Sequence, residues 1–166
     1  MRVDKTNLPR LGQGLYWQDL SVGQSFRTFR RTVTETDLVN FTSVTGMLEA
    51  IFIDASFDEG AIVGRVVPAA LTYCLIEGFI LQSMIQGTGL AMLELTQKIL
   101  APVFVGDTIE ATVQVTALRP TSKKGRAVVT SLIDVFKTDG THVMTYTATR
   151  LLAGQPPNTD RQEASE

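Results

Sequence analysis

Few side chains in this sequence could act as nucleophiles, bases or metal ligands. The chain has one histidine, His142, and one cysteine, Cys74. A nucleophilic pair with histidine would therefore have to use His142 or a second chain. His142 follows the turn signal Asp139-Gly140, where a solvent-exposed or turn-stabilising role is the more frequent one. One histidine and one cysteine nearly exclude an ordinary zinc site, so the sequence predicts no metal and no cofactor.

Two glutamates are candidates for acid–base chemistry. Glu77 is the only charge in the apolar run at 69–85. A buried carboxylate must be paired or have a raised pKa, and a raised pKa would make Glu77 a general base; the alternative is that it faces solvent or a partner subunit. Glu49 lies in the long connection at 47–65, where a displaced catalytic acid and a solvated carboxylate both remain open. Asp54, in the same connection, is favoured as a ligand for backbone amides.

Length, charge and composition favour one soluble domain. The chain has 166 residues, a formal net charge of −2 and 44% hydrophobic residues. A nucleic-acid binder usually carries a basic domain or stripe, so no nucleic-acid partner is expected. The first 14 residues lack an apolar core, and polar residues interrupt the run at 69–85. We therefore expect no signal peptide, no membrane span and a cytoplasmic location.

Two helices should flank the connection. Thr34 precedes an acidic first turn and apolar residues at helical spacing, and Gly46 can end this first helix. Pro68 is expected at the first position of a second helix, which Gly87 ends. That second helix is apolar on nearly every side, so we expect the rest of the fold to enclose it.

Strands should make up most of the remaining chain. One is expected at 24–33, and three or four more are expected in a row after the second helix, within 90–100, 107–118, 126–136 and 141–152. Apolar and polar residues alternate at 107–118, which indicates a half-buried strand, whereas 126–136 is apolar on both faces and should be more central. This order predicts an α+β fold in which an antiparallel sheet wraps around a central apolar helix. By composition the chain divides into a lead-in at 1–15, a folded domain at 16–152 and a disordered tail at 153–166.

Three stretches carry motifs of a known family. Residues 36–46 resemble an opening helix that ends in Thr/Ser-Gly, and residues 64–69 (Gly-Arg-Val-Val-Pro-Ala) resemble a Gly-Arg-Ile-Ala-His-Gly turn. Residues 101–109 contain Pro-Val-Phe-Val-Gly-Asp-Thr-Ile, similar to Pro-Val-x-x-Gly-Asp-Thr-Leu. These motifs resemble the MaoC-like acyl dehydratases, or R-specific enoyl-CoA hydratases. The resemblance implies the hotdog fold, with an acyl-CoA or another acyl thioester as ligand.

The catalytic signature of that family is replaced here. Its Gly-Asp-x-Asn-Pro-x-His-x-Asp aligns without a gap with residues 46–54, which puts Met47 at the aspartate and Phe52 at the histidine. A second family histidine falls on Pro68. Asp54 matches the last signature residue, and we retain it as a candidate substrate-binding residue. Hydration of an enoyl thioester needs one group to activate water and one to protonate the α-carbon. A thioether and a phenyl ring do neither, so we expect Met47 and Phe52 to close an apolar pocket.

Two other features could still bind a thioester. The resemblance implies that a backbone amide at the start of the central helix holds the thioester oxygen. Pro68, Ala69 and Ala70 occupy that turn, and free N–H groups there do not depend on the side chain. A cluster of cations around an expected turn could hold the phosphates of coenzyme A, although an ordinary basic turn is the alternative. The cluster comprises Arg119, Lys123, Lys124 and Arg126.

Three functions remain open from the sequence. The first is a MaoC-like hydratase or dehydratase, by descent, that binds an acyl thioester. The second is a non-catalytic binding or scaffold subunit, and the third is an acyl-CoA thioesterase that uses Glu77 or Glu49. A sheet edge needs cover, so we expect a homodimer, with a heterodimer containing a catalytic hydratase-like chain as the alternative.

Overall fold

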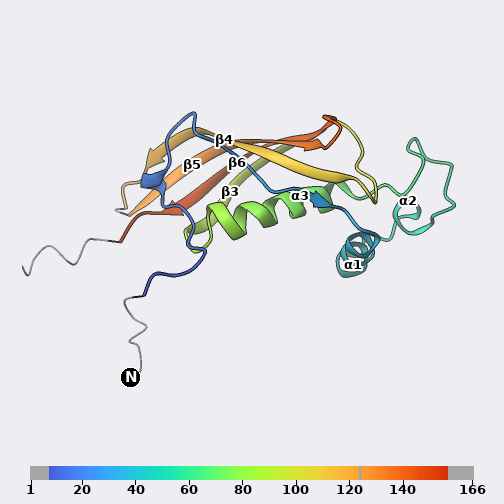
Figure 1. Cartoon of the computed structure of the whole chain (residues 1–166), viewed down its shortest axis with the longest axis horizontal. Coiled ribbons are helices and arrows are strands. Elements are labelled where there is room, and N and C mark those ends of the chain that lie inside the picture. The colour runs from blue at the N-terminus through green and yellow to red at the C-terminus, as the bar shows by residue number, and fades with distance from the viewer. Residues whose placement is uncertain (1–7, 124, 157–166) are drawn as a thin grey trace, which may run out of the picture.

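A computed structural model describes residues 8–123 and 125–156 of the chain. An antiparallel sheet with the order β1-β4-β5-β6-β3 dominates it, and β2 also pairs with β4 (Figure 1). The strands are β1 (Ser25–Arg27), β2 (Arg31–Thr32), β3 (Gly89–Ile99), β4 (Thr108–Pro120), β5 (Arg126–Lys137) and β6 (His142–Ala153). The helical elements are a 3₁₀ turn (Trp17–Asp19), α1 (Glu35–Thr45), α2 (Ala50–Ile53) and α3 (Ala69–Phe79), which continues as a π-helical turn (Ile80–Met84).

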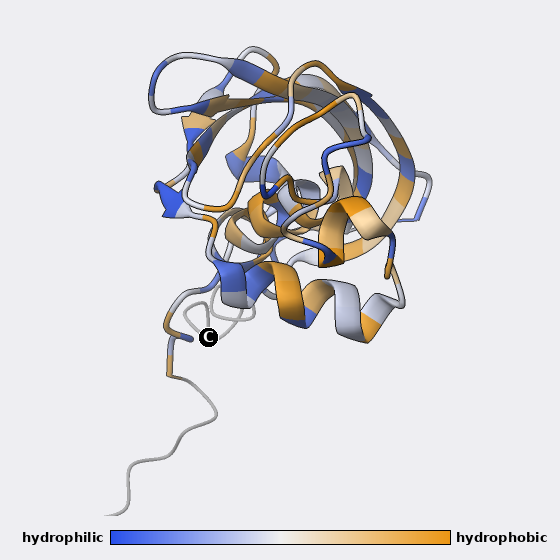
Figure 2. Cartoon of the chain, turned by 90° about the vertical axis from the view of Figure 1, so that its right-hand side faces the viewer, coloured by the Kyte–Doolittle hydropathy of each residue, from blue (hydrophilic) through white to orange (hydrophobic). Residues whose placement is uncertain are grey.

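The sheet curls around α3, and the core lies between them (Figure 2). Inward-facing residues alternate along β4, β5 and β6, as period-2 burial of one strand face requires. They meet the buried Leu71, Ile76 and Ile80 of α3 and its π-helical turn. The predicted α+β fold, with an antiparallel sheet around a central apolar helix, is confirmed.

The enclosure expected for the central helix is incomplete in the single chain. Cys74 is exposed, and Leu81 in the following π-helical turn is 50% exposed. The sheet covers one side of the helix, but the side toward β3 opens into a cavity. The prediction of full enclosure was therefore wrong for the single chain, because an apolar helix sequence does not by itself determine which of its sides the sheet covers.

The edge strand β3 continues that open side. Its one strand partner in the described residues is β6, and all 11 of its residues are exposed. Several are large and apolar, with 39–54% of their surface accessible: Leu90, Met92, Leu93, Leu95 and Ile99. This edge is thus both unpaired and apolar.

Three local details differ from the sequence prediction. The strand expected at 24–33 is split into β1 and β2, because the Thr28 side chain accepts a bond from the Ala111 N–H and interrupts the ladder. The connection at 47–65 includes the short helix α2. Pro68 is the N-cap of α3 rather than its first residue.

In the described part of the chain, no helix is long and apolar enough to cross a membrane.

Candidate functional site

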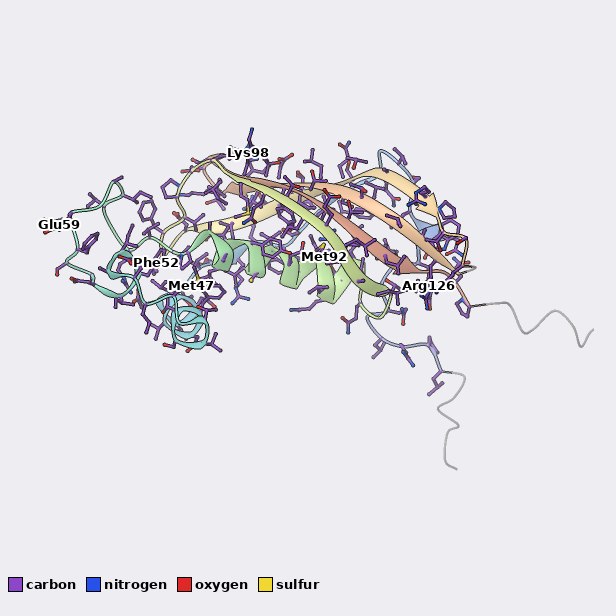
Figure 3. All side chains as sticks on the ribbon, turned by 180° about the vertical axis from the view of Figure 1, so that it is seen from behind. Met47, Phe52, Glu59, Met92, Lys98 and Arg126 are labelled. Carbon is purple, nitrogen blue, oxygen red and sulfur yellow. The ribbon has the colours of Figure 1, made fainter. Side chains whose placement is uncertain are left out.

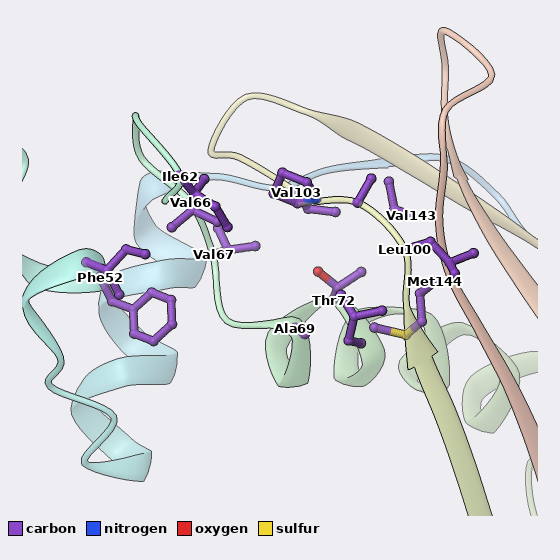
Figure 4. A pocket seen from close by; sticks show the side chains of 14 residues that line it. Phe52, Ile62, Val66, Val67, Ala69, Thr72, Leu100, Val103, Val143 and Met144 are labelled. Atoms are coloured by element: carbon purple, nitrogen blue, oxygen red, sulfur yellow. The ribbon is translucent and has the colours of Figure 1, made fainter. Parts of the chain in front are cut away.

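An apolar cavity of about 340 Å³ lies at the start of α3 (Figure 4). The connection at 47–67, the segment between β3 and β4, and the start of β6 form its other walls. The lining residues are Ile51, Phe52, Ile62, Val66, Val67, Ala69, Thr72, Ile99, Leu100, Ala101, Pro102, Val103, Val143 and Met144. None of these side chains can donate or accept a proton near neutral pH, so the cavity can bind an apolar group but brings no acid or base to it.

The first turn of α3 presents backbone N–H groups beside this cavity. Pro68 is buried, and its carbonyl accepts from the N–H groups of Leu71 (2.9 Å) and Thr72 (3.4 Å). In the described part of the chain, the N–H groups of Ala69 and Ala70 have no acceptor. Of Pro68, Ala69 and Ala70, which the sequence placed together, only Ala69 lines the cavity. Its free N–H group lies at the positive end of the helix dipole, which favours a partly negative oxygen.

Phe52 has the predicted place and Met47 does not. Phe52 lines the cavity, and its carbonyl accepts a 2.8 Å hydrogen bond from Nη1 of Arg65. Arg65 also forms an ion pair with Glu35 in α1, so one guanidinium holds the loop against that helix. Met47 is 38% exposed and does not line the cavity. The expectation that both side chains close the pocket was wrong for Met47, which follows the left-handed turn at Gly46 (φ 72°) at the far end of α1 (Figure 3).

The two acidic candidates of the loop lie outside the cavity. Glu49 is the exposed N-cap residue of α2, and its side chain makes no capping bond there. Asp54 is exposed and accepts hydrogen bonds from the N–H (2.8 Å) and hydroxyl (2.7 Å) of Ser56. These bonds lower the pKa of Asp54. The interpretation of Asp54 as a ligand for a backbone amide is confirmed. The Asp54 side chain does not line the cavity.

Glu77 belongs to a different, buried cluster. Its Oε1 accepts hydrogen bonds from the Tyr146 hydroxyl (2.7 Å) and from Nη2 of Arg150 (2.5 Å). Burial, and then the neighbouring Glu77 charge, raises the pKa of Tyr146. The cluster borders a second cavity, of about 570 Å³, between α3 and β3. Glu77 is therefore paired within its own chain, and it faces neither solvent nor the first cavity.

The remaining polar candidates are scattered. His142 stacks on Phe136, and its Nε2 lies 3.1 Å from Oδ1 of Asp134 without hydrogen-bond geometry. Lys123 and Arg126 are exposed at the β4–β5 turn. Arg126 lies at the opposite end of the sheet from Phe52 (Figure 3). Lys124 lies outside the described residues. Within one chain, therefore, the described cations of this turn do not reach the cavity.

Two residues beside the cavity were missed by sequence reasoning. Thr72 is its one polar lining side chain, and its Oγ1 is buried without a hydrogen-bond partner in the described structure. The sequence carried no signal for that, because a helical threonine usually bonds a carbonyl one turn earlier. Arg65 was noted only as part of a motif. A third residue, Arg150, lies in the buried cluster with Glu77. Its burial was predictable from the alternation of β6, because it is in phase with the inward-facing Tyr146 and Ala148.

The sequence profile of the MaoC like domain matches residues 19–135, so the chain belongs to the MaoC-like domain family. The 3-hydroxybutyryl-CoA dehydratase of Methylorubrum extorquens is 28% identical over 119 residues, which cover 72% of this chain and 74% of that protein. The predicted family is thereby confirmed.

Solved structures support the same fold. The (R)-hydratase from A. caviae involved in PHA biosynthesis is 25% identical, with a TM-score of 0.66 over 83% of this chain and 99% of that one. A conserved hypothetical protein from Mycobacterium tuberculosis with a double hotdog fold is 19% identical, with a TM-score of 0.73 over 90% of this chain and 47% of that one. The sheet around α3 is therefore a hotdog fold, as the resemblance implied.

Proposed function

We propose that this chain binds an acyl thioester in the apolar cavity at the start of α3 and does not hydrate it. The cavity volume of about 340 Å³ falls in the range of small-molecule sites, about 300–1,000 Å³. The free N–H group of Ala69 would hold the thioester oxygen, and the apolar walls would enclose the acyl chain. The observation that carries the proposal is that this cavity, lined by Phe52, contains no acid or base.

Loss of the acid–base pair should abolish hydration rather than binding. A positioned general acid or base contributes about 10²–10⁴ to a rate, so we expect hydration at least about 10³ slower than in a relative that has both groups. Holding the carbonyl needs only the backbone, which survives the replacement of histidine by Pro68. The relatives with hydratase names supply the ligand class, and the apolar cavity of this chain argues against their reaction.

The thioesterase alternative finds less support. Glu77 is ion-paired with Arg150 and hydrogen-bonded to Tyr146, away from the first cavity. Glu49 is exposed and makes no contact with that cavity. Neither carboxylate is aimed at a thioester held by Ala69.

The unpaired edge of β3 supports a further proposal, pairing of two chains. We propose a homodimer in which two β3 edges meet and the exposed apolar residues of β3 are covered. A mixed dimer with a hydratase-like chain would use the same edge, and it is the form that a scaffold function would take.

Calorimetric titration with crotonyl-CoA and butanoyl-CoA, beside a hydration assay, tests the proposed activity. We expect both thioesters to bind and no hydration of crotonyl-CoA to be detected. Ala69→Leu fills the cavity at the start of α3 and should weaken binding at least tenfold. The matched control is Ala55→Leu, at an exposed loop alanine, which should leave binding unchanged.

Two results would contradict the proposal. Absence of binding by the unmodified protein would leave the scaffold function as the better account. Hydration at a rate typical of the family, unaffected by Phe52→Ala, would show that a group outside this cavity performs the chemistry.

A further inference from the structure

The hydroxyl of Thr72 is an unexplained polar group in an apolar cavity. Thr72 is 2% exposed, and in the described structure its Oγ1 has no hydrogen-bond partner. Figure 4 shows this oxygen directed into the cavity rather than along α3. A threonine inside a helix usually bonds the carbonyl one turn earlier, here that of Pro68. The Pro68 carbonyl instead accepts from two backbone N–H groups.

A buried hydroxyl without a partner destabilises the fold, so its presence needs an explanation. Thr42 in α1 shows the ordinary arrangement. It is equally buried, at 3% exposure, but its hydroxyl donates to the Leu38 carbonyl at 2.9 Å. The two threonines therefore differ in what their hydroxyls meet rather than in how deeply they are buried.

The position of Thr72 along α3 relates its hydroxyl to the bound thioester. Thr72 comes three residues after Ala69, so both lie on the same side of the helix. At 1.5 Å per residue, they are about 4.5 Å apart along the axis. If the N–H group of Ala69 holds the thioester oxygen, the Thr72 hydroxyl lies beside the first few carbons of the acyl chain.

We propose that Thr72 is a specificity residue that binds an oxygen atom carried on those first carbons. The cavity would then prefer hydroxyacyl or oxoacyl thioesters to unsubstituted ones. A hydroxyl can both donate and accept, so either oxygen function satisfies it. This inference rests on the proposed binding of acyl thioesters and adds to it which acyl groups are selected.

Affinities of short thioesters without a nucleotide test the inference. The probes are the butanoyl, 3-hydroxybutanoyl and 3-oxobutanoyl thioesters of N-acetylcysteamine, with both enantiomers of the hydroxy compound. We expect at least one oxygen-bearing probe to bind about tenfold more tightly than the butanoyl probe, which corresponds to one added hydrogen bond. Thr72→Val should remove this preference, and Thr72→Ser should retain it.

Thermal stability without ligand gives a second, independent readout. Thr72→Val replaces an unpartnered hydroxyl with a methyl group, so the melting temperature should rise by about 2–4 °C. The matched control Thr42→Val removes a hydroxyl that has its bond, and its melting temperature should not rise. A fall for Thr72→Val would show that the hydroxyl already has a partner and would overturn the inference.

The binding outcomes separate this inference from the function on which it rests. If the thioesters bind without an oxygen preference, or if Thr72→Val keeps the preference, Thr72 is not the specificity residue and the proposed function stands. If no thioester binds the unmodified protein, both are overturned. The preference of the unmodified protein needs no variant, so a Thr72→Val chain that does not fold leaves the test intact.

Discussion

Glu77 and Glu49 have the same side chain in opposite surroundings. Glu77 is buried and shares its Oε1 between Tyr146 and Arg150, whereas Glu49 is exposed on the loop. A buried ion pair adds little net stability, but removal of one partner leaves the other as an uncompensated buried charge. The glutamate that first suggests a catalytic base is thus a structural group in this chain.

Removal of these two carboxylates should therefore have unequal effects. Glu77→Ala should lower the free energy of unfolding by about 3–5 kcal/mol, because Arg150 loses its partner. Glu49→Ala should change it by less than about 0.5 kcal/mol. Urea unfolding followed by circular dichroism measures both. The double change Glu77→Leu with Arg150→Met removes both charges and should recover most of the loss; equal stability of the two single variants would contradict this account.

Sequence reasoning predicted some residues of the site and not others. The gapless alignment predicted that Phe52 closes an apolar pocket, and Phe52 does line the apolar cavity at the start of α3. The same alignment misplaced Met47, because the direction of a side chain after a left-handed glycine depends on packing. The Thr72 hydroxyl could not be predicted at all, since its isolation depends on which groups occupy the Pro68 carbonyl.

At the scale of elements, α1 and the loop with α2 form one unit through Arg65. Its guanidinium donates to the Phe52 carbonyl and pairs with Glu35, so it joins the first turn of α1 to the cavity wall. The capping box of Thr34 and Asp37 fixes that turn in place. The position of Phe52 therefore depends on a contact 13 residues away in the chain.

Arg65→Ala should release this loop without unfolding the sheet. We expect amide hydrogen exchange at 50–53 to accelerate at least about tenfold, while exchange in β5 and β6 stays unchanged. The matched control is Arg119→Ala, at an exposed arginine of β4. Acceleration across the whole chain would show that Arg65 supports the core rather than the loop.

The same contact predicts a pH dependence. The hydrogen bond from Arg65 holds the pKa of Glu35 below its ordinary value of 4.5. A carboxylate whose pKa is lowered on folding stabilises the folded state above the ordinary value and loses that contribution as pH falls through the lowered one. The rate of amide hydrogen exchange at 50–53, corrected for the pH dependence of the intrinsic exchange rate, should be constant above pH 4.5 and should increase below it. Glu35→Gln should remove this dependence, and an unchanged profile in that variant would contradict it.

The elements were more predictable than their details. Among the long strands, β4 follows directly from period-2 alternation, and α1 follows from a cap, an acidic first turn and a terminal glycine. The division of 24–33 into β1 and β2 was not predictable, because it depends on a bond between Thr28 and a residue 83 positions away.

At the scale of the whole molecule, the unpaired edge of β3 dominates. We expect Leu93→Lys with Leu95→Lys to convert the proposed dimer to a monomer, because two charges would face each other across the twofold edge. Size-exclusion chromatography with light scattering measures the mass against 18.1 kDa per chain. The control Val22→Lys, at a residue 63% exposed before β1, should remain dimeric. A mass of 18.1 kDa for the unmodified protein at micromolar concentration would refute the dimer.

An antiparallel pairing of two β3 edges would also bring the basic turn into reach of the cavity. Arg126 pairs with Ala153, and Gly89 pairs with Leu152, so this turn lies at the Gly89 end of β3. The cavity lies at the Ile99 end, about 35 Å away along the strand. Twofold pairing places the Gly89 end of one chain against the Ile99 end of the other.

The double variant Lys123→Ala with Arg126→Ala should therefore bind acyl-CoA about three- to tenfold more weakly. Its affinity for a short pantetheine thioester should be unchanged. High salt should reduce the affinity of the unmodified protein for acyl-CoA in the same way, since exposed charges are screened. Calorimetry with both ligands provides the measurement. An equal loss for both ligands would remove the basic turn from the site.

Because the apolar edge of β3 is open in the single chain, the stability of this protein should depend on its concentration. If the proposed homodimer forms, dilution should lower its melting temperature, because dissociation would uncover apolar surface and mass action would no longer favour the folded pair. Any relative with a compatible edge competes for the same place, so the relative amounts of the two chains would decide which pairs form. If this chain binds thioesters without hydrating them, as proposed, mixed pairs would lower the number of hydrating sites in the population and leave the number of binding sites unchanged.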